Sequence, residues 1–170
     1  MKTVSKIAAF FAALAVSACV TPVTVVSAVD TDIRETLKPA ETTVNFDSEL
    51  SDYERLDQAR LETALIEEFT ESLTGADNPE LVTLVDISID ILAYREPNAA
   101  LAILISDTAQ IVGNVVLTDP ESGSTVGEYY IEVIEGAGGV LGLAAADTNE
   151  PELAREFVEK FMEFLMKDDV

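Results

Sequence analysis

Acidic side chains are the main candidates for chemistry in this sequence, which contains 32 Asp and Glu residues, 10 Lys and Arg, and no His. A hydrolase can pair two carboxylates as general acid and general base. The candidates are Asp86 and Asp90, which share one face of an expected strand, together with Asp107 and Asp119. Four residues along a strand separate two backbones by about 13 Å, whereas the carboxyl groups of glycosidases lie about 5 to 9.5 Å apart. We therefore expect Asp86 and Asp90 to be solvated side chains unless acids from elsewhere join them.

Other catalytic groups are excluded by composition. The absence of His rules out a His-based triad and a His-ligated zinc site, and a single Cys rules out an internal disulfide and a zinc ribbon. A nucleophilic Ser would need a base, and no Ser-x-x-Lys motif follows the leader. The Gly-rich stretch 136–142 lacks the Gly-Lys-Ser or Gly-Lys-Thr end of a phosphate loop. We expect no cofactor and no catalytic residue.

Calcium is the metal to consider, because Asp147, Asn149, Glu150 and Glu152 crowd one connection. Acids are also enriched at the start of any helix, where they interact with the helix dipole. The pair Asp30-x-Asp32 lacks the Gly and the terminal Glu of a calcium loop. We therefore expect no metal site.

The charge balance also limits the partners. Nucleic acid is excluded, because phosphate binding needs clustered Lys and Arg and the formal net charge is −22. A surface this acidic repels anionic lipid headgroups and attracts basic protein patches. We expect a protein partner with a basic surface; the oligomeric state is left open.

The only cysteine, Cys19, follows a short leader of a recognisable kind. Lys2 and Lys6 precede the apolar run 7–16, and Val16-Ser17-Ala18 stand directly before Cys19. This run is too short to span a bilayer and is typical of a secretory signal peptide. The sequence Val16-Ser17-Ala18-Cys19 resembles the lipobox of bacterial lipoproteins. The resemblance implies cleavage before Cys19 and lipidation of its thiol. An ordinary signal peptide with a spare thiol is the alternative.

A lipoprotein leader sets the expected domain organisation. Residues 1–18 would be the signal peptide, residues 19–45 a lipid-anchored tether that could include a first strand at 23–29, and residues 46–170 the folded domain. Removal of Lys2 and Lys6 changes the formal charge from −22 to −24. Two or three acyl chains would hold the protein to a membrane permanently. Since Val20 and not Asp follows the cysteine, the family rule of enteric bacteria favours the outer membrane, with the domain facing the periplasm.

The elements that must position these residues are two helices and several strands. Ser51-Asp52-Tyr53-Glu54 matches a capping box, and a helix stripe of Leu61, Leu65, Phe69 and Leu73 runs on to Gly75. A closing helix starts near Asn149, with Pro151 and Glu152 in its first turn. Its apolar stripe consists of Leu153, Phe157, Phe161, Phe164 and Leu165. We expect the Phe residues on these stripes to be core rather than a ligand site.

Strands fill the middle of the chain. Residues 81–94 alternate with period two, with Thr83, Val85, Ile87, Ile89, Ile91 and Ala93 on one face. Residues 101–106 could be a short strand, and 109–118 and 125–134 flank a turn at Asp119-Pro120-Glu121-Ser122-Gly123, which predicts an antiparallel hairpin. The expected fold is α+β, with an antiparallel sheet of three to four strands, two amphipathic helices on one face and the order (β)-α-β-β-β-α.

This order of elements, with the Gly-rich stretch 136–142 and the closing helix, resembles small bacterial envelope lipoproteins of unassigned function. A similar α+β core occurs in the curli secretion channel lipoprotein and in the amino-terminal domain of TolB. The resemblance implies a binding or assembly module without catalysis. Two alternatives stay open: a carboxylate-based hydrolase acting on envelope glycans, and membrane contact through residues 136–143, where Val140, Leu141 and Leu143 are the apolar candidates.

Overall fold

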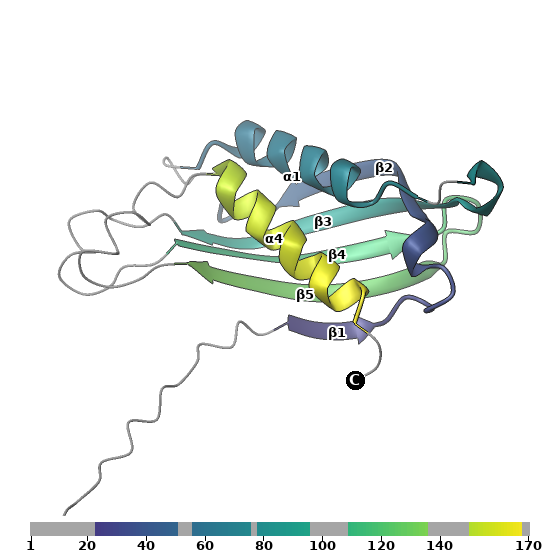
Figure 1. Cartoon of the computed structure of the whole chain (residues 1–170). Coiled ribbons are helices and arrows are strands. Elements are labelled where there is room, and N and C mark those ends of the chain that lie inside the picture. Colours follow the sequence, from purple (N-terminus) through teal and green to yellow (C-terminus); the bar gives the residue numbers. More distant parts are fainter. Residues whose placement is uncertain (1–22, 51–55, 76–77, 96–108, 136–149, 168–170) are drawn as a thin grey trace, which may run out of the picture.

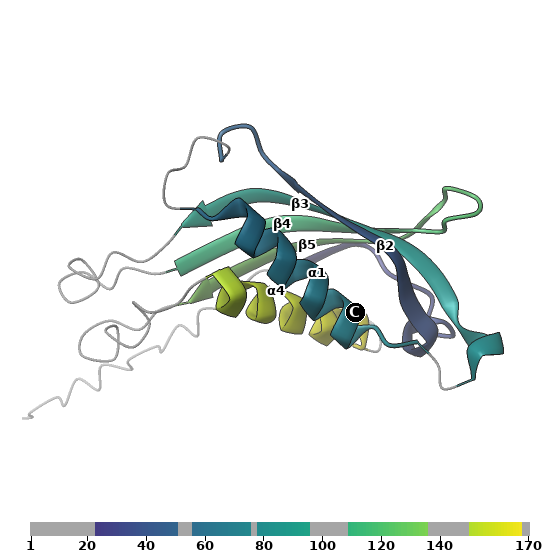
Figure 2. The ribbon, with the colours of Figure 1, turned by 90° about the horizontal axis from the view of Figure 1, so that it is seen from above.

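The computed structural model describes residues 23–50, 56–75, 78–95, 109–135 and 150–167 of the chain. This part of the chain forms one five-stranded sheet, and two helices lie side by side on one of its faces (Figure 1 and Figure 2). No helix among these residues has the length and apolar character needed to span a membrane. The elements are β1 (Val23–Ser27), η1 (Arg34–Thr36), β2 (Leu37–Phe46), α1 (Gln58–Ser72), η2 (Pro79–Leu81), β3 (Thr83–Arg95), β4 (Ala109–Thr118), β5 (Thr125–Glu135) and α4 (Glu150–Leu165).

The sheet has the strand order β1-β5-β4-β3-β2. One cross-strand row passes through all five strands and joins Val23, Ile131, Gly113, Ile91 and Phe46. The expected α+β class is confirmed. Two features differ from the predicted antiparallel sheet of three to four strands: the sheet has five strands, and β2 pairs with β3 in parallel.

The amino-terminal segment contributes two strands, β1 and β2, to the sheet. Residues 23–46 therefore belong to the folded domain. Of the tether predicted over residues 19–45, the alternative of a first strand within residues 23–29 agrees with β1, whereas β2 was not predicted. Pro39 had argued against regular structure there. It is tolerated because β2 is an edge strand and its register with β3 shifts between Pro39 and Glu41.

Strand β3 confirms the predicted alternation over most of its length. Val85, Ile87, Ile89 and Ile91 are buried, whereas Asp86, Ser88 and Asp90 are half-buried on the opposite face. The register with β4 then shifts between Ile91 and Ala93. An extra residue in one strand moves the following side chains to the other face, so Tyr94 is buried in place of the predicted Ala93.

The hairpin between β4 and β5 is confirmed, and both strands have the predicted bounds to within one residue. Gly123 adopts φ 69°, a left-handed conformation that Gly accepts at little cost. The Asp119 carboxylate accepts hydrogen bonds from the backbone N–H groups of Glu121 and Ser122, both at 2.8 Å. These bonds stabilise the ionised form, so the pKa of Asp119 lies below its ordinary value. Residues 101–106 lie outside the described part of the chain.

Helix α1 begins at Gln58, seven residues after the predicted start at Ser51. The Asp57 side chain caps it by accepting from the N–H of Arg60 at 3.1 Å. Asp57 thus supplies the cap that the capping-box pattern predicts at Ser51, and residues 51–55 lie outside the described residues. Gly75 follows the helix with φ 78°, as predicted for a left-handed residue beyond a helix end.

The core lies between the helices and the sheet. The predicted stripes are buried, with Phe69, Phe157 and Phe161 fully enclosed. The Phe161 ring packs 5.1 Å from the ring of Phe69 and 5.2 Å, edge-on, from that of Tyr129. Phe164 differs from the prediction, because it lies at the edge of the core with Lys160 and Lys167 over its ring.

Candidate functional site

The acids expected for a hydrolase are not assembled into a pair among the described residues. Asp86 and Asp90 lie on the same face of β3, about 13 Å apart along the strand, and Asp90 accepts a hydrogen bond from Asn45 Nδ2 at 2.9 Å. Asp119 holds the β4–β5 turn, and Asp107 lies outside the described residues. This part of the chain therefore offers no carboxylate pair of glycosidase geometry.

Glu150, one of the calcium candidates, has a structural role instead. Its side chain is buried at the first turn of α4, where Oε1 accepts from the N–H of Asp57 at 3.2 Å and Oε2 lies 3.6 Å from Arg60 Nη1. The carboxylate thus holds the first turns of both helices together. Asp147 and Asn149 lie outside the described residues, and within those residues no group of three or more acids or sulfur ligands could bind a metal.

The face of the sheet opposite the helices is open, as Figure 2 shows from the edge. The side chains that point outward on this face are those that alternate with the buried residues of β3, β4 and β5, and the strand register extends the same rows to β1 and β2. We call the central rows of this surface the open face. It comprises Thr24 of β1; Glu41, Thr43 and Asn45 of β2; Asp86, Ser88 and Asp90 of β3; Val112, Asn114, Val116 and Thr118 of β4; and Glu128, Tyr130 and Glu132 of β5.

The central rows of the open face carry five carboxylates, those of Glu41, Asp86, Asp90, Glu128 and Glu132. The basic residues Lys38 and Arg95 lie in the rows at its two ends, opposite Leu84 and Gln110. The ion pairs shown between described side chains join residues of α1 and α4 instead. On the open face, Asn45 donates to Asp90 and Gln110 donates to Glu132, each at 2.9 Å, so each of these two acids accepts a hydrogen bond from an amide.

Two of these acids form an unfavourable pair. Glu41 of β2 lies directly opposite Asp86 of β3 in the parallel register. Like charges directly opposite each other in a sheet are destabilising. A local arrangement that costs stability and is still present points to a surface shaped by something other than folding. Apolar side chains lie among and around the acids, including Val116 and Tyr130, and the exposed Leu84 and Leu92 of β3.

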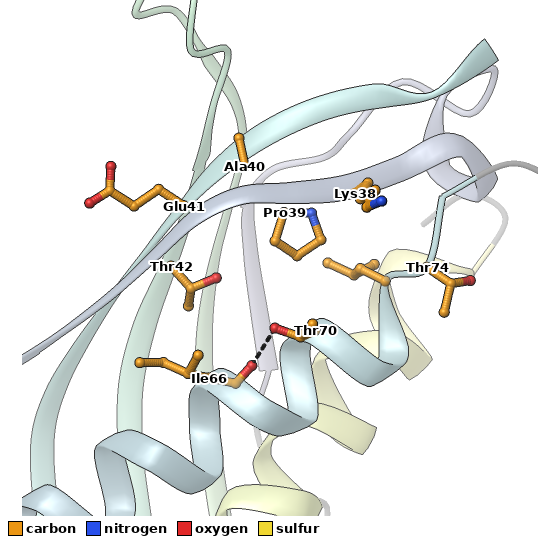
Figure 3. A pocket seen from close by; sticks show the side chains of 9 residues that line it. Lys38, Pro39, Ala40, Glu41, Thr42, Ile66, Thr70 and Thr74 are labelled. Atoms are coloured by element: carbon orange, nitrogen blue, oxygen red, sulfur yellow. Dashed lines mark hydrogen bonds between the residues drawn. The ribbon is translucent and has the colours of Figure 1, made fainter. Parts of the chain in front are cut away.

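A groove of about 530 Å³ runs along the edge of the sheet between β2 and the second half of α1 (Figure 3). The β2 side contributes Lys38, Pro39, Ala40, Glu41 and Thr42, and the α1 side contributes Ile66, Thr70, Leu73 and Thr74. The Thr70 hydroxyl donates to the Ile66 carbonyl at 2.7 Å and is therefore occupied within its own helix. The lining combines methyl groups and hydroxyls with one Lys and one Glu.

Sequence reasoning missed Glu41, Glu128 and Glu132 as members of one surface. Each was visible as an acid in a strand-like segment, but β2 was not recognised as a strand. The pairing register, which places Glu41 beside Asp86, is not encoded in local periodicity. The predicted lipidation site, Cys19, and the predicted membrane-contact segment 136–143 both lie outside the described residues.

Comparisons with known proteins show which fold class these elements define. No family model matches the chain, and no curated protein matches it. Among solved structures, the PelC dodecamer from Paraburkholderia phytofirmans aligns with 87% of this chain and 99% of the PelC chain, at 9% identity and a TM-score of 0.53. A single-substitution variant of the same dodecamer covers 86% and 98%, at 10% identity and a TM-score of 0.55. Identity this low establishes a shared fold and nothing further.

A third structure is a candidate lipoprotein from Caulobacter crescentus. It aligns with 78% of this chain and 89% of its own, at 13% identity and a TM-score of 0.45. That score is too low to support an inference about this chain.

Proposed function

We propose that this chain is a lipid-anchored binding or assembly module of the bacterial cell envelope, without catalysis. The observation that carries this proposal is the open face, a sheet surface whose central rows hold five carboxylates and whose two end rows hold one Lys and one Arg. The lipobox-like Val16-Ser17-Ala18-Cys19 supports the anchor. The outer membrane, with the domain in the periplasm, is the expected location.

The partner on the open face is a protein surface that presents Lys and Arg together with apolar side chains. Such a surface would neutralise Glu41, Asp86 and Glu128 and would cover Val116 and Tyr130. Charge complementarity of this kind raises the rate of association and selects against acidic competitors. It would also relieve the repulsion between Glu41 and Asp86.

Self-assembly is compatible with this proposal. PelC, which shares the fold, forms a dodecamer. In this chain the two edges of the sheet, β1 and β2, are different strands at opposite sides. An edge-to-edge contact would join β1 of one copy to β2 of the next copy. Such a head-to-tail contact closes into a ring when the rotation between neighbouring copies is a simple fraction of a full turn. The open face would then remain free for the basic partner.

A pair of charge reversals with a matched control tests the proposal. Asp86→Lys with Glu128→Lys changes the open face, and Glu67→Lys with Glu71→Lys makes the same change in net charge on exposed positions of α1. The probe is a synthetic peptide of alternating Lys and Leu, titrated by calorimetry. We expect the open-face variant to bind about tenfold more weakly, because each exposed charge contact is worth up to about 1 kcal/mol. Equal weakening by both variants would reduce the effect to net charge and refute a specific face.

The anchor is tested separately by Cys19→Ser. Native protein should fractionate with membranes and show an intact mass increased by acyl chains, and the variant should do neither. Native protein that retains its leader and stays in the soluble fraction would contradict the anchor.

A further inference from the structure

Strand β4 runs along the middle of the open face and is uncharged, because none of its ten residues is Asp, Glu, Lys or Arg. It lies between β3 and β5 (Figure 1). Each of these two neighbours presents a pair of carboxylates on the open face. We call the pairs the β3 acids (Asp86 and Asp90) and the β5 acids (Glu128 and Glu132).

The strand register places these four acids alternately on the two sides of β4. In order along β4, the cross-strand pairs are Asp86–Thr118, Glu128–Val116, Asp90–Asn114 and Glu132–Val112. Successive acids are two residues apart, about 7 Å, so the row of four spans about 20 Å. Since β3 and β5 are separated by two strand spacings, the β3 acids and the β5 acids are about 10 Å apart across the face. We call this area the β4 strip.

The β4 strip has the footprint of a single α-helix. A helix with its side chains is about 10 to 12 Å wide, and about 13 residues of helix cover 20 Å. Residues seven apart lie on the same flank of a helix, about 10 Å along its axis. Two such pairs of Lys or Arg, one on each flank and offset by five or six residues, would face the β3 acids and the β5 acids. The next row beyond each end of the strip contains a base, Lys38 or Arg95, so the acidic surface ends there.

Exposed apolar side chains continue the β4 strip and are a second sign of a docking surface. Leu84, Leu92 and Ile134 are 50%, 41% and 45% exposed. Each lies two residues beyond an acid of the strip on the same strand: Leu84 before Asp86, Leu92 after Asp90, and Ile134 after Glu132. Apolar surface left in contact with water beside a polar rim is typical of a protein interaction site. An occupant therefore needs an apolar stripe between its two basic flanks.

A second copy of this chain does not have the required chemistry. Two open faces would bring acids against acids, and like charges brought together disfavour association. The helices of a second copy are also acidic, because among their described residues only Arg60 and Arg155 are exposed bases. The exposed acids of these helices are Glu62, Glu67, Glu71, Glu152, Glu159 and Glu163. The occupant is thus a different protein.

We infer that one amphipathic helix of a partner protein binds lengthwise along β4, with an apolar stripe on the strand and with Lys or Arg on both flanks. The inference rests on the proposed function, since it states the form in which the basic partner reaches the open face. In this position the helix would cover Val116 and Tyr130, and its flanks would neutralise the β3 acids on one side and the β5 acids on the other.

Two synthetic peptides of about 14 residues test the helical form of the partner. Both contain the same numbers of Lys and Leu. One has a Leu stripe at helical spacing with Lys on both flanks, and the other alternates Lys and Leu as a strand does. In calorimetric titrations of the full-length protein, we expect the helical peptide to bind at least about tenfold more tightly. Its circular dichroism should show helix gained on binding.

The results separate this inference from the proposed function. An alternating peptide that binds equally well or better would overturn the helix but would leave a basic partner in place. If Asp86→Lys with Glu128→Lys weakens neither peptide, the open face is not the binding surface, and the proposed function fails together with the inference.

Neutralising one side of the strip at a time tests the position of the helix. Asp86→Asn with Asp90→Asn removes the charges of the β3 acids, and Glu128→Gln with Glu132→Gln removes those of the β5 acids. The new amides keep the oxygens that accept from Asn45 and Gln110. Each double variant should weaken the helical peptide about three- to tenfold, as expected for two exposed ion pairs. Glu67→Gln with Glu71→Gln on α1 is the matched control and should leave binding unchanged.

A third peptide, in which Gln replaces Lys on one flank only, completes the test. It should be insensitive to one of the two double variants and remain sensitive to the other, because each flank is coupled to its own strand. Equal sensitivity to both variants would show that the helix does not lie between the β3 acids and the β5 acids and would overturn the inference.

Discussion

Tyr129 and Arg34 hold the backbone of Val29 from its two sides. The Tyr129 hydroxyl accepts the N–H of Val29 at 3.2 Å, and Arg34 Nε donates to the Val29 carbonyl at 3.0 Å. Arg34 also donates from Nη1 to the carbonyl of Lys167 at 2.8 Å, just beyond α4. These bonds fasten the segment after β1 to β5 and to the end of α4. Buried polar groups satisfied in this way fix one arrangement of the elements.

Tyr129→Phe should lower the free energy of unfolding by about 1 to 3 kcal/mol, because it leaves the buried N–H of Val29 without its acceptor. Burial raises the pKa of Tyr129 above its ordinary value of 10.0, an effect that the Val29 hydrogen bond and Arg34 only partly oppose. A group whose folded pKa is raised stabilises the protein fully below its unfolded pKa. That stabilisation is lost as the pH rises above 10 through the folded pKa.

Urea unfolding at neutral and at alkaline pH measures both effects. The native protein should lose stability above pH 10 more steeply than Tyr129→Phe does. Tyr130→Phe is the control, since Tyr130 is a half-buried neighbour on the open face. Parallel pH profiles for native protein and Tyr129→Phe would count against this assignment.

Glu41→Gln should stabilise the fold by a few tenths of a kcal/mol, because it removes a like charge directly opposite Asp86. Thermal unfolding at low and high salt checks the cause. At about 1 M salt the screening length falls to roughly 3 Å, and the difference should vanish. Stabilisation that persists at high salt would have to come from something other than repulsion. Under the proposed function, the same substitution should weaken binding of a basic partner.

Glu150→Ala should destabilise the protein by about 1 to 3 kcal/mol, because the N–H of Asp57 loses an acceptor and Arg60 loses its partner. Glu150→Gln keeps an acceptor oxygen and should cost less. Glu159→Ala on the exposed side of α4 is the matched control and should be close to neutral. Urea unfolding curves rank the three variants, and equal costs for Glu150→Ala and Glu159→Ala would refute the role in joining the helices.

Gly113→Ala should destabilise the fold by about 1 to 3 kcal/mol through overpacking. A methyl group there would lie 2.9 Å from the backbone oxygen of Asp90 and 3.2 Å from the ring of Phe157. Since the oxygen belongs to a neighbouring strand, it cannot move aside without disturbing the sheet. Gly123→Ala is the comparison, because its surroundings are open and only its positive φ opposes the change. A Gly113→Ala protein that melts like the native one would show that the sheet adapts.

The parts of the fold with strong local patterns were predictable from the sequence. The alternation in β3 and the turn at Asp119–Gly123 predicted their elements, as did the stripe that contains Leu61 and Phe69. Helix α1 was placed too early because a Ser-Glu capping pattern precedes the actual cap, Asp57. Strand β2 was missed because Pro39 and several Thr residues dilute its pattern, and its parallel partner is more than forty residues away.

The candidate site was less accessible to sequence reasoning than the fold. Asp86 and Asp90 were correctly placed on one solvated strand face. Their neighbours on this face, Glu41 and Glu128, come from β2 and β5. The local sequence pattern does not predict which strands lie next to β3 and β4. A surface of this kind is produced by strand order and register, which depend on the whole chain.

The pairing of the first strand with the last has a consequence for folding as the chain emerges. Val29 and Tyr129 are 100 residues apart, and β1 pairs only with β5. The segment Val-Thr-Val-Val-Ser is therefore available early but has no partner until most of the polypeptide has been delivered. Contacts of such long sequence separation slow folding and leave β-prone segments exposed to aggregation in the meantime. A chaperone that holds the nascent chain should thus increase the yield of native protein mainly by protecting this first strand.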